Sequence, residues 1–271
     1  MNATRFSLGD DLARLGLQPG DTVMVHASLR AIGPVEGGAD SVISAVCDSI
    51  GPAGTMVMVI GTDHAGREEV KHLSRAEQIA ALEALPPVDI RTAPADPEIG
   101  ALAEAFRQTG GVVVGLHPDS RFAAIGPGAA HIVSEIPLND YLGPDSPLDR
   151  LCDRQGMILR LGADTDTVTA LHLAEYYAGV ADKRRASRHY HITDDRGSRV
   201  VQVDSLDDSD GIAPWEGGDY FTEILNEFLA SGKAKCGRVG RARAELFNAN
   251  DIVCFGSKWM TAHLNPRPSA R

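Results

Sequence analysis

The fold is decided by residues 22–60, which read TVMVHASLRAIGPVEGGADSVISAVCDSIGPAGTMVMVI. Residues 22–29 and 55–60 are dominated by apolar side chains such as valine and methionine, a composition typical of buried strands. Between them, apolar residues recur every three or four positions from Val42 to Ile50, as they do on one face of a helix. A strand, a helix and a strand in this order predict two parallel neighbouring strands joined by a right-handed crossover.

Strands and helices continue to alternate through the rest of the chain. The pattern predicts helices near 7–15 (with Ser7 as the N-cap), 98–108, 147–156, 167–180 and 219–230, and strands near 112–116, 121–126 and 157–162. The alternation of 184–203 around a central Asp-Asp-Arg-Gly predicts a β-hairpin. The sequence therefore predicts one α/β domain over residues 1–271, with a mixed central sheet flanked by helices.

A long insertion interrupts this pattern near residues 61–97. Ser74 and Glu77 have the spacing of a capping box, which predicts a helix from there to about Leu85. Residues 86–97 contain four prolines, and proline favours an extended chain over a helix. The insertion is therefore expected to be a short helix followed by an extended loop.

The composition limits the class of protein. Of 271 residues, 43% are hydrophobic, and 26 lysines and arginines against 37 aspartates and glutamates give a net charge of −11. This acidic balance argues against nucleic acids and anionic membranes as partners, and it favours a cationic partner. No apolar run approaches the roughly 18 residues of a membrane-spanning helix. The N-terminus lacks the pattern of a secretory signal, so a cytoplasmic protein is expected.

Motifs of several common enzyme classes are missing from the sequence. It contains no GxSxG, GxxxxGK[ST], GxGxxG or HExxH pattern, which argues against serine hydrolases, P-loop enzymes, Rossmann dehydrogenases and zincins. The four cysteines, Cys47, Cys152, Cys236 and Cys254, lie far apart. This spacing predicts reduced thiols rather than a disulfide framework or a zinc site, and no bound metal is expected.

Two segments carry residues suited to cofactor binding or catalysis. Ser28 is followed by a loop with Gly37 and Gly38, and a strand, loop and helix of this kind can present backbone N–H groups to a phosphate. Glycines in such loops also serve purely structural turns. Further along, His172 and Glu175 are three residues apart on a predicted helix, so their side chains can meet. A histidine oriented by a carboxylate suits a general base, although a purely structural pair has the same spacing.

A third segment, residues 116–120, displays His117 and Asp119 directly after a predicted strand. Pro118 fixes the chain between them. Loops at strand ends often hold functional groups, and they also form ordinary turns. Both interpretations stay open at this point.

An acidic run that includes Asp208 follows the predicted hairpin. It resembles a calcium loop only superficially, because Leu206 and Gly217 stand where that loop requires ligands. The run is either a solvated loop or a rim that binds cations. Within the hairpin, His189 and His191 share one strand face, which indicates an exposed polar face in preference to a metal site.

Taken together, these segments resemble the aminoglycoside 3-N-acetyltransferases, an acetyl-CoA-dependent antibiotic-resistance family whose fold is unrelated to the GNAT fold. The matching pieces follow the order of the family: GDTVMVHASLRAIGPVEGGADSVISAV (20–46), GPAGTMVM (51–58), GALAEAFRQTGGVVVGLHPDSRFAAIGP (100–127), GPDSPLDRL (143–151), DTVTALHLAE (166–175), DSDG (208–211) and NDIVCFGSKWM (250–260). The resemblance implies an α/β fold with a mixed sheet. It also implies acetyl transfer from acetyl-CoA to the 3-amino group of the deoxystreptamine ring of an aminoglycoside.

The resemblance also implies roles for individual residues. The catalytic histidine of the family falls on His172, and Glu175 is its expected partner. The residues expected near acetyl-CoA are Ser28, Leu29, Arg30, Val35, Gly37, Gly38, Val168, Thr169 and Ala170. Those expected near the antibiotic are Asp63, His117, Asp119 and Asp208.

The chemistry implied by the resemblance is direct transfer within a ternary complex. A neutral His172 suits the removal of a proton from the acceptor amine near neutral pH. No serine or cysteine stands out as a nucleophile. An acidic protein attracts a polycationic antibiotic. A homodimer is one assembly that the sequence leaves open.

Two alternative functions stay open. The family carries aromatic-rich segments that line the antibiotic site, whereas residues 61–97, expected to form a substrate-lining insertion, contain no aromatic residue. This departure favours an acyltransferase of the same fold that acts on a different metabolic amine. A non-catalytic protein that binds a cation or CoA is the alternative from another class, and it would leave His172 without a chemical role.

Overall fold

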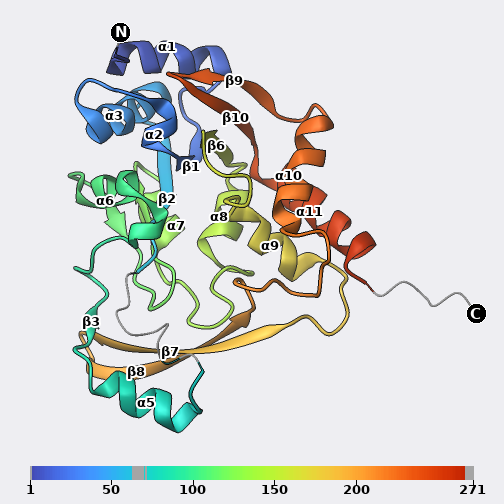
Figure 1. Cartoon of the computed structure of the whole chain (residues 1–271). Helices are drawn as coiled ribbons and strands as arrows, with labels where there is room; N and C mark the ends of the chain where they lie inside the picture. The colour runs from blue at the N-terminus through green and yellow to red at the C-terminus, as the bar shows by residue number, and fades with distance from the viewer. Residues whose placement is uncertain (1, 63–69, 71, 266–271) are drawn as a thin grey trace, which may run out of the picture.

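A seven-stranded mixed sheet forms the centre of the structure, a computed structural model that describes residues 2–62, 70 and 72–265 (Figure 1). The strand order is β4-β5-β2-β1-β6-β10-β9. The central strands β2, β1 and β6 run parallel, and the other neighbours pair antiparallel. The strands are β1 (Thr22–Ala27), β2 (Thr55–Val59), β4 (Val113–Val114), β5 (Phe122–Ile125), β6 (Met157–Leu161), β9 (Lys235–Val239) and β10 (Ala242–Asn248). The predicted mixed sheet and the parallel pairing of β1 with β2 are confirmed.

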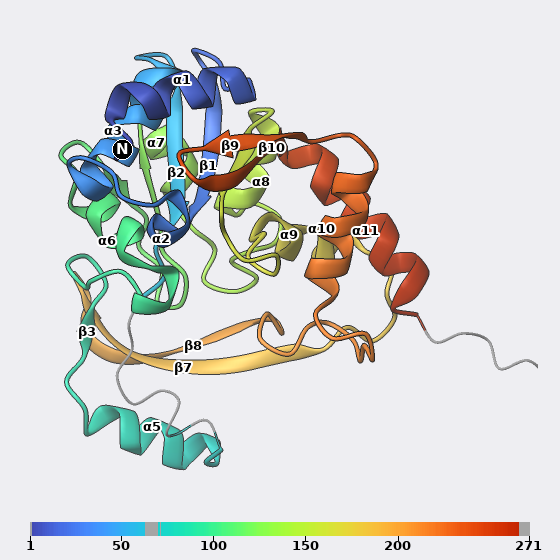
Figure 2. The same cartoon turned by 45° about the horizontal axis from the view of Figure 1, so that its top comes forward.

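Helices cover both faces of this sheet, which gives three layers (Figures 1 and 2). One face packs against α1 (Arg5–Leu15), α2 (Leu29–Ile32), α3 (Gly38–Ile50) and α6 (Ala101–Gln108). The other packs against α7 (Ala129–Val133), α8 (Pro147–Asp153), α9 (Ala170–Tyr177), α10 (Tyr220–Ala230) and α11 (Ala249–His263). Val23 and Val25 of β1 lie in the first core and Met24 lies in the second. Successive strand side chains point to opposite faces, so a strand that is apolar at every position serves both cores.

Local capping explains where predicted elements shift. The prediction of Ser7 as the N-cap of the first helix was wrong: the Thr4 hydroxyl caps α1 by accepting from the Ser7 N–H at 3.2 Å. Strand β1 ends at Ala27 because the Ser28 hydroxyl accepts from the Ala31 N–H at 3.3 Å and begins α2. This turn places Ser28 at the carboxyl end of a central strand, the edge where ligands bind in open α/β sheets.

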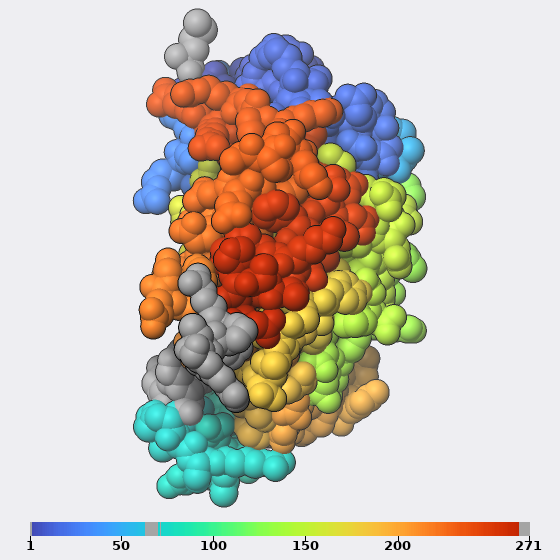
Figure 3. All heavy atoms as spheres, turned by 90° about the vertical axis from the view of Figure 1, so that its right-hand side faces the viewer, coloured from blue at the N-terminus to red at the C-terminus, as the bar shows by residue number. Residues whose placement is uncertain are grey.

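The insertion folds onto a second sheet of three strands, β3 (Val88–Asp89), β7 (Arg185–Asp194) and β8 (Gly197–Leu206). The predicted β7–β8 hairpin is confirmed. Helix α5 (Arg75–Glu83) packs on the hairpin, and in Figure 3 it protrudes beneath the C-terminal helices. The short helix η1 (Pro97–Ile99) then leads into α6.

Two histidines of β7 hold α5 in place. The His189 Nδ1 lies 3.0 Å from the Gln78 Oε1, and the His191 Nδ1 lies 2.9 Å from the carbonyl oxygens of Leu82 and Leu85. His189 is buried. The prediction of an exposed polar face was therefore wrong for His189, because α5 covers this face of the hairpin.

Arg121, which precedes β5, ties both ends of the insertion to the central sheet. The side chain is fully buried, and its Nε donates to the Gly61 carbonyl and the Thr62 hydroxyl, both at 2.9 Å. Its terminal nitrogens donate to the carbonyl oxygens of Ile90, Ala93 and Pro94. Burial lowers the pKa of Arg121 to about 10, which still leaves the guanidinium charged at neutral pH.

Arg121→Leu is expected to lower the free energy of unfolding by about 3 kcal/mol or more, because several buried acceptors lose their donor and each costs about 1–3 kcal/mol. Arg150 provides a matched control, since it also donates to backbone carbonyls (residues 131–135), but largely at an exposed site where water can replace it. Urea unfolding of both variants measures the difference. Equal losses for Arg121→Leu and Arg150→Leu would contradict the anchoring role.

Candidate active site

Two cavities meet at His172. The first, of about 710 Å³, is bounded mainly by residues 208–221 and is called here the acidic cavity. The second, of about 680 Å³, opens at the carboxyl ends of β1 and β2 and is called the strand-end cavity. Among the residues that the structure describes, His172 and Asp166 line both cavities. A side chain in this position can touch a molecule bound in either one.

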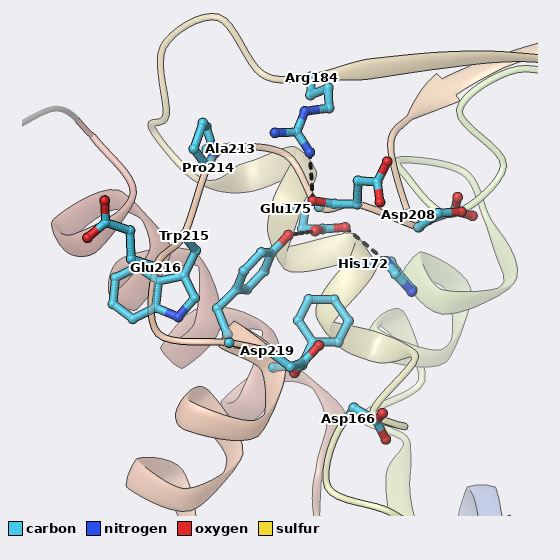
Figure 4. A pocket seen from close by; sticks show the side chains of 16 residues that line it. Asp166, His172, Glu175, Arg184, Asp208, Ala213, Pro214, Trp215, Glu216 and Asp219 are labelled. Atoms are coloured by element: carbon cyan, nitrogen blue, oxygen red, sulfur yellow. Dashed lines mark hydrogen bonds and ion pairs between the residues drawn. The ribbon is translucent and has the colours of Figure 1, made fainter. Parts of the chain in front are cut away.

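The His172 ring is fixed by a carboxylate, which is itself held by a tyrosine hydroxyl (Figure 4). The His172 Nδ1 lies 2.9 Å from the Glu175 Oε2, and the Glu175 Oε1 accepts a hydrogen bond from the Tyr220 hydroxyl. The Tyr220 hydroxyl in turn accepts from the Ile212 N–H at 3.1 Å. Glu175 is 1% exposed, whereas the side chain of His172 keeps 20% of its surface exposed. Because Nδ1 is occupied, Nε2 is the ring nitrogen left for a substrate.

The surroundings of His172 favour its charged form. Burial lowers the pKa of the ring, but the charge and hydrogen bond of Glu175, together with the charges of Asp208 and Asp219, outweigh burial and raise the pKa above its ordinary value. Burial also raises the pKa of Tyr220, so this hydroxyl stays protonated and donates to Glu175. The ring can therefore take up a proton and hold it next to a fixed carboxylate.

Carboxylates dominate the lining of the acidic cavity (Figure 4). They are Asp166, Glu175, Asp208, Asp210, Glu216 and Asp219. Arg184 is the one arginine in the described lining, and its guanidinium donates to the Asp210 carbonyl at 2.7 Å. The rings of Trp215 and Phe221 add apolar walls. A cavity with this excess of negative charge attracts cations.

Asp208 belongs to a network of charges behind the cavity wall. It pairs with Arg188 at 2.5 Å and accepts from the Tyr141 hydroxyl at 2.6 Å. Burial raises the pKa of Asp208, but the charges of His172 and Arg188 outweigh burial and lower it below its ordinary value. Asp119 lies 3.9 Å from the same arginine and lines neither cavity. Asp119 therefore supports Asp208 through Arg188.

The strand-end cavity contains Ser28, Leu29, Arg30 and Thr169, four of the residues expected near acetyl-CoA. Its lining mixes apolar side chains such as Met58 with the exposed cation Arg30. A cavity of this volume with apolar walls and a few polar groups suits a flexible ligand that carries amides and a charged end. The residues present therefore fit the pantetheine arm of CoA.

The other five residues of that set lie away from the two cavities. Val168 and Ala170 are buried in the core at the start of α9, and Val35 packs against the core on the opposite face of the sheet. Gly37 and Gly38 are exposed at the start of α3, with φ angles of 77° and 60° that favour glycine. Their contact with a cofactor stays a prediction.

The residues expected near the antibiotic also separate. Asp208 lines the acidic cavity, and Asp63 lies outside the described residues. His117 is 1% exposed, its Nδ1 accepts from the N–H groups of residues 119 and 120, and its Nε2 lies 3.0 Å from the Leu138 carbonyl oxygen. The ring thus fixes its own loop. None of the described residues between 61 and 97 lines either cavity.

Two further residues at the site were given no role from the sequence, although the strand end that contains His26 was singled out. Tyr220 comes 45 residues after Glu175, and no local pattern links the two. His26 of β1 lines the strand-end cavity, and its Nε2 has no hydrogen-bond partner among the described residues. Burial, with the charge of Arg160, lowers the pKa of His26 to about 3, so this ring is neutral. A polar residue at the end of an apolar strand was the available signal for His26.

No group of three or more histidine, cysteine, aspartate or glutamate side chains is arranged to hold a metal ion within residues 2–62, 70 and 72–265. Asp208, in the acidic run for which a solvated loop and a cation-binding rim were both left open, is paired with Arg188. Over the same described part of the chain, no helix combines the length and apolarity needed to cross a bilayer.

The chain belongs to the aminoglycoside 3-N-acetyltransferase family, which matches residues 24–261. It is 39% identical to the aminoglycoside N(3)-acetyltransferase VIII of Streptomyces fradiae, over 96% of this chain and 93% of that protein. Its structure is similar to AAC-IIIb in a binary complex with CoASH, with a TM-score of 0.91, 33% identity and coverage of 99% of this chain and 100% of that chain. It is also similar to AAC-VIa bound to sisomicin, with a TM-score of 0.88, 34% identity and coverage of 97% and 98%. The family resemblance seen in the sequence is confirmed.

Proposed function

We propose that this protein transfers the acetyl group of acetyl-CoA to the 3-amino group of an aminoglycoside, by direct attack within a ternary complex. The observation that carries the proposal is the position of His172, which lines both the strand-end cavity and the acidic cavity. We assign acetyl-CoA to the strand-end cavity and the cationic acceptor to the acidic cavity. The two reacting groups then meet at the imidazole.

In this mechanism His172 is the general base. Its Nδ1 is held by Glu175, so Nε2 accepts a proton from the acceptor amine as the amine nitrogen attacks the thioester carbonyl. The new C–N bond forms, the C–S bond breaks, and the imidazolium returns its proton to the departing CoA thiolate. Glu175 stabilises the imidazolium, and Tyr220 holds Glu175 from the opposite side.

The lining of the cavities supports direct transfer rather than an acyl-enzyme intermediate. No cysteine is among the described residues that line them. Burial raises the pKa of Cys152 to about 12, which leaves almost no thiolate at neutral pH. Ser28 lines the strand-end cavity, but its hydroxyl oxygen already accepts the Ala31 N–H. The amine is therefore the attacking nucleophile in our proposal.

The assignment of the acceptor amine to the acidic cavity rests on the charge of the residues that line this cavity. The acidic cavity suits a molecule with several ammonium groups, and Asp208 is our proposed contact for one of them. The relatives named above support the same two ligand classes, since one was solved with CoASH and another with sisomicin. His117 and Asp119 would act indirectly, by fixing the loop and the arginine behind Asp208.

A second candidate function is acyl transfer to a different metabolic amine by the same residues. The absence of aromatic residues from 61–97 is the sequence feature that favours it, although none of the described residues of this segment lines either cavity. Non-catalytic binding of a cation or CoA is less well supported. It does not explain why the buried Glu175 holds His172 at the place where the two cavities meet.

Acetyl-CoA turnover with a panel of aminoglycosides separates these functions. We expect CoA release that depends on the aminoglycoside, with a mono-acetylated product whose acetyl group is placed on the 3-amino nitrogen by NMR. CoA release only with other amines would favour the metabolic acyltransferase. Tight binding of an aminoglycoside in calorimetry, without turnover, would favour the binding protein.

A further inference from the structure

Asp166 occupies a position as central as that of His172. Of the described residues, these two line both cavities. Asp166 lies in the loop between β6 and α9, and Figure 4 shows it on the segment that leads to the helix carrying His172. Neither the proposed proton transfer nor the assigned acetyl-CoA site gives this carboxylate a role.

The loop that carries Asp166 is held from beneath by a buried arginine. Arg160 of β6 is 1% exposed, and its Nη2 donates to the carbonyl oxygens of Ala163 at 2.8 Å and Asp164 at 2.7 Å. The opposite side of the guanidinium pairs with the buried Glu245 at 3.2 Å. The Thr167 N–H and hydroxyl also donate to the Asp164 carbonyl. The backbone on both sides of Asp166 is therefore fixed.

The Asp166 carboxylate itself makes no hydrogen bond and no ion pair with a described residue, and its residue is exposed. Glu175 and Asp208 of the same cavity differ from it, whereas the carboxylates of Asp210 and Glu216 also have no direct partner among the described residues but line the acidic cavity alone. Both oxygens of Glu175 are used by His172 and Tyr220, and Asp208 is paired with Arg188. A fixed loop thus presents a carboxylate without a direct partner among the described residues, at the place where the two cavities join. The buried Arg160 beneath the loop interacts with its charge but makes no hydrogen bond or ion pair with it.

We propose that Asp166 binds a second ammonium group of the acceptor and so positions the reacting amine at His172. The ligand class is a polyamine sugar with at least two amino groups near one another. The negative charge serves the amine and not the thioester, because a carboxylate beside the carbonyl would destabilise the oxyanion that develops there. This role rests on the proposed function, and it makes Asp166 a residue that determines specificity.

Asp166→Asn tests the proposal, with Asp164→Asn as the matched control. Asp164 lies in the same loop, is also exposed, and lines the strand-end cavity but not the acidic cavity. We expect Asp166→Asn to raise the KM for the aminoglycoside by about tenfold or more, as when a charge-assisted hydrogen bond is lost. We expect kcat and the KM for acetyl-CoA to stay close to wild type. Asp164→Asn should leave the KM for the aminoglycoside close to wild type, because Asp164 does not line the acidic cavity.

Two further measurements make the outcome decisive. The Asp166→Asn penalty should shrink for an aminoglycoside whose neighbouring ring amine has been acylated, which a merely structural defect would not produce. Calorimetry measures the affinity for the aminoglycoside in wild type and in Asp166→Asn, and it needs no turnover. A lack of turnover in the wild type would overturn only the proposed function. Equal affinity of wild type and Asp166→Asn, or equal losses in Asp166→Asn and Asp164→Asn, would overturn the inference.

Discussion

His172→Ala is expected to lower kcat for aminoglycoside acetylation by about 10²–10⁴-fold, the usual contribution of a positioned general base. The amine can still attack the thioester without the imidazole, but water must then take its proton. Binding of CoA should persist, because the remainder of the strand-end cavity is unchanged. Steady-state kinetics with saturating acetyl-CoA, together with calorimetry of CoA binding, measure the two effects separately.

His131→Ala is the matched control for this loss. His131 is an exposed histidine of α7 that lines neither cavity, so its removal should leave kcat close to wild type. Thermal unfolding of both variants shows whether the fold is retained. A folded His172→Ala protein with the wild-type kcat would remove His172 as the base and would favour the structural interpretation of its pair with Glu175.

The parts of the fold that could be predicted are those that local pattern determines. Strands β1 and β2 carry apolar side chains on both faces, and the amphipathic helix α3 lies between them in the chain. The parallel crossover therefore follows from the sequence. Strand β9 was not predicted, because Lys235 and Cys236 are exposed and the strand exists through its pairing with β10. The anchoring role of Arg121 was also missed, since its partners come from residues 27 to 60 positions away.

The same distinction applies to the candidate site. Their spacing on a helix predicted that His172 and Glu175 pair, and in the structure the His172 Nδ1 lies 2.9 Å from the Glu175 Oε2. Tyr220 and the Arg188 network arrive from other elements, so only the tertiary fold shows them. The family resemblance implied that Asp119 contacts the antibiotic, and this contact stays a prediction. The position of Asp119 beside Arg188 depends on a hairpin far along the chain. Spacing within one element is readable from sequence, whereas contact between elements is not.

Glu175→Gln is expected to move the acid limb of the pH profile of kcat/KM to lower pH and to lower its plateau. In the wild type, Glu175 is the main group that raises the pKa of His172 against the effect of burial. The base works when neutral, so the rate rises as pH increases through this raised pKa and levels off above it. Glutamine removes the charge, burial then dominates, and the pKa of His172 falls. The ring is neutral at lower pH but becomes a weaker base, because no carboxylate stabilises the imidazolium.

Glu216→Gln is the matched control, since Glu216 lines the same cavity and is not among the groups that shift the pKa of His172. Its acid limb should coincide with that of wild type. The part of the pH profile that reports the pKa of the acceptor amine provides an internal reference. It should be the same for wild type, Glu175→Gln and Glu216→Gln, because all three act on the same amine. NMR titration of the His172 ring gives the same pKa values without turnover. An acid limb and a ring pKa that do not move in Glu175→Gln would mean that this carboxylate holds the ring in place without stabilising its charge.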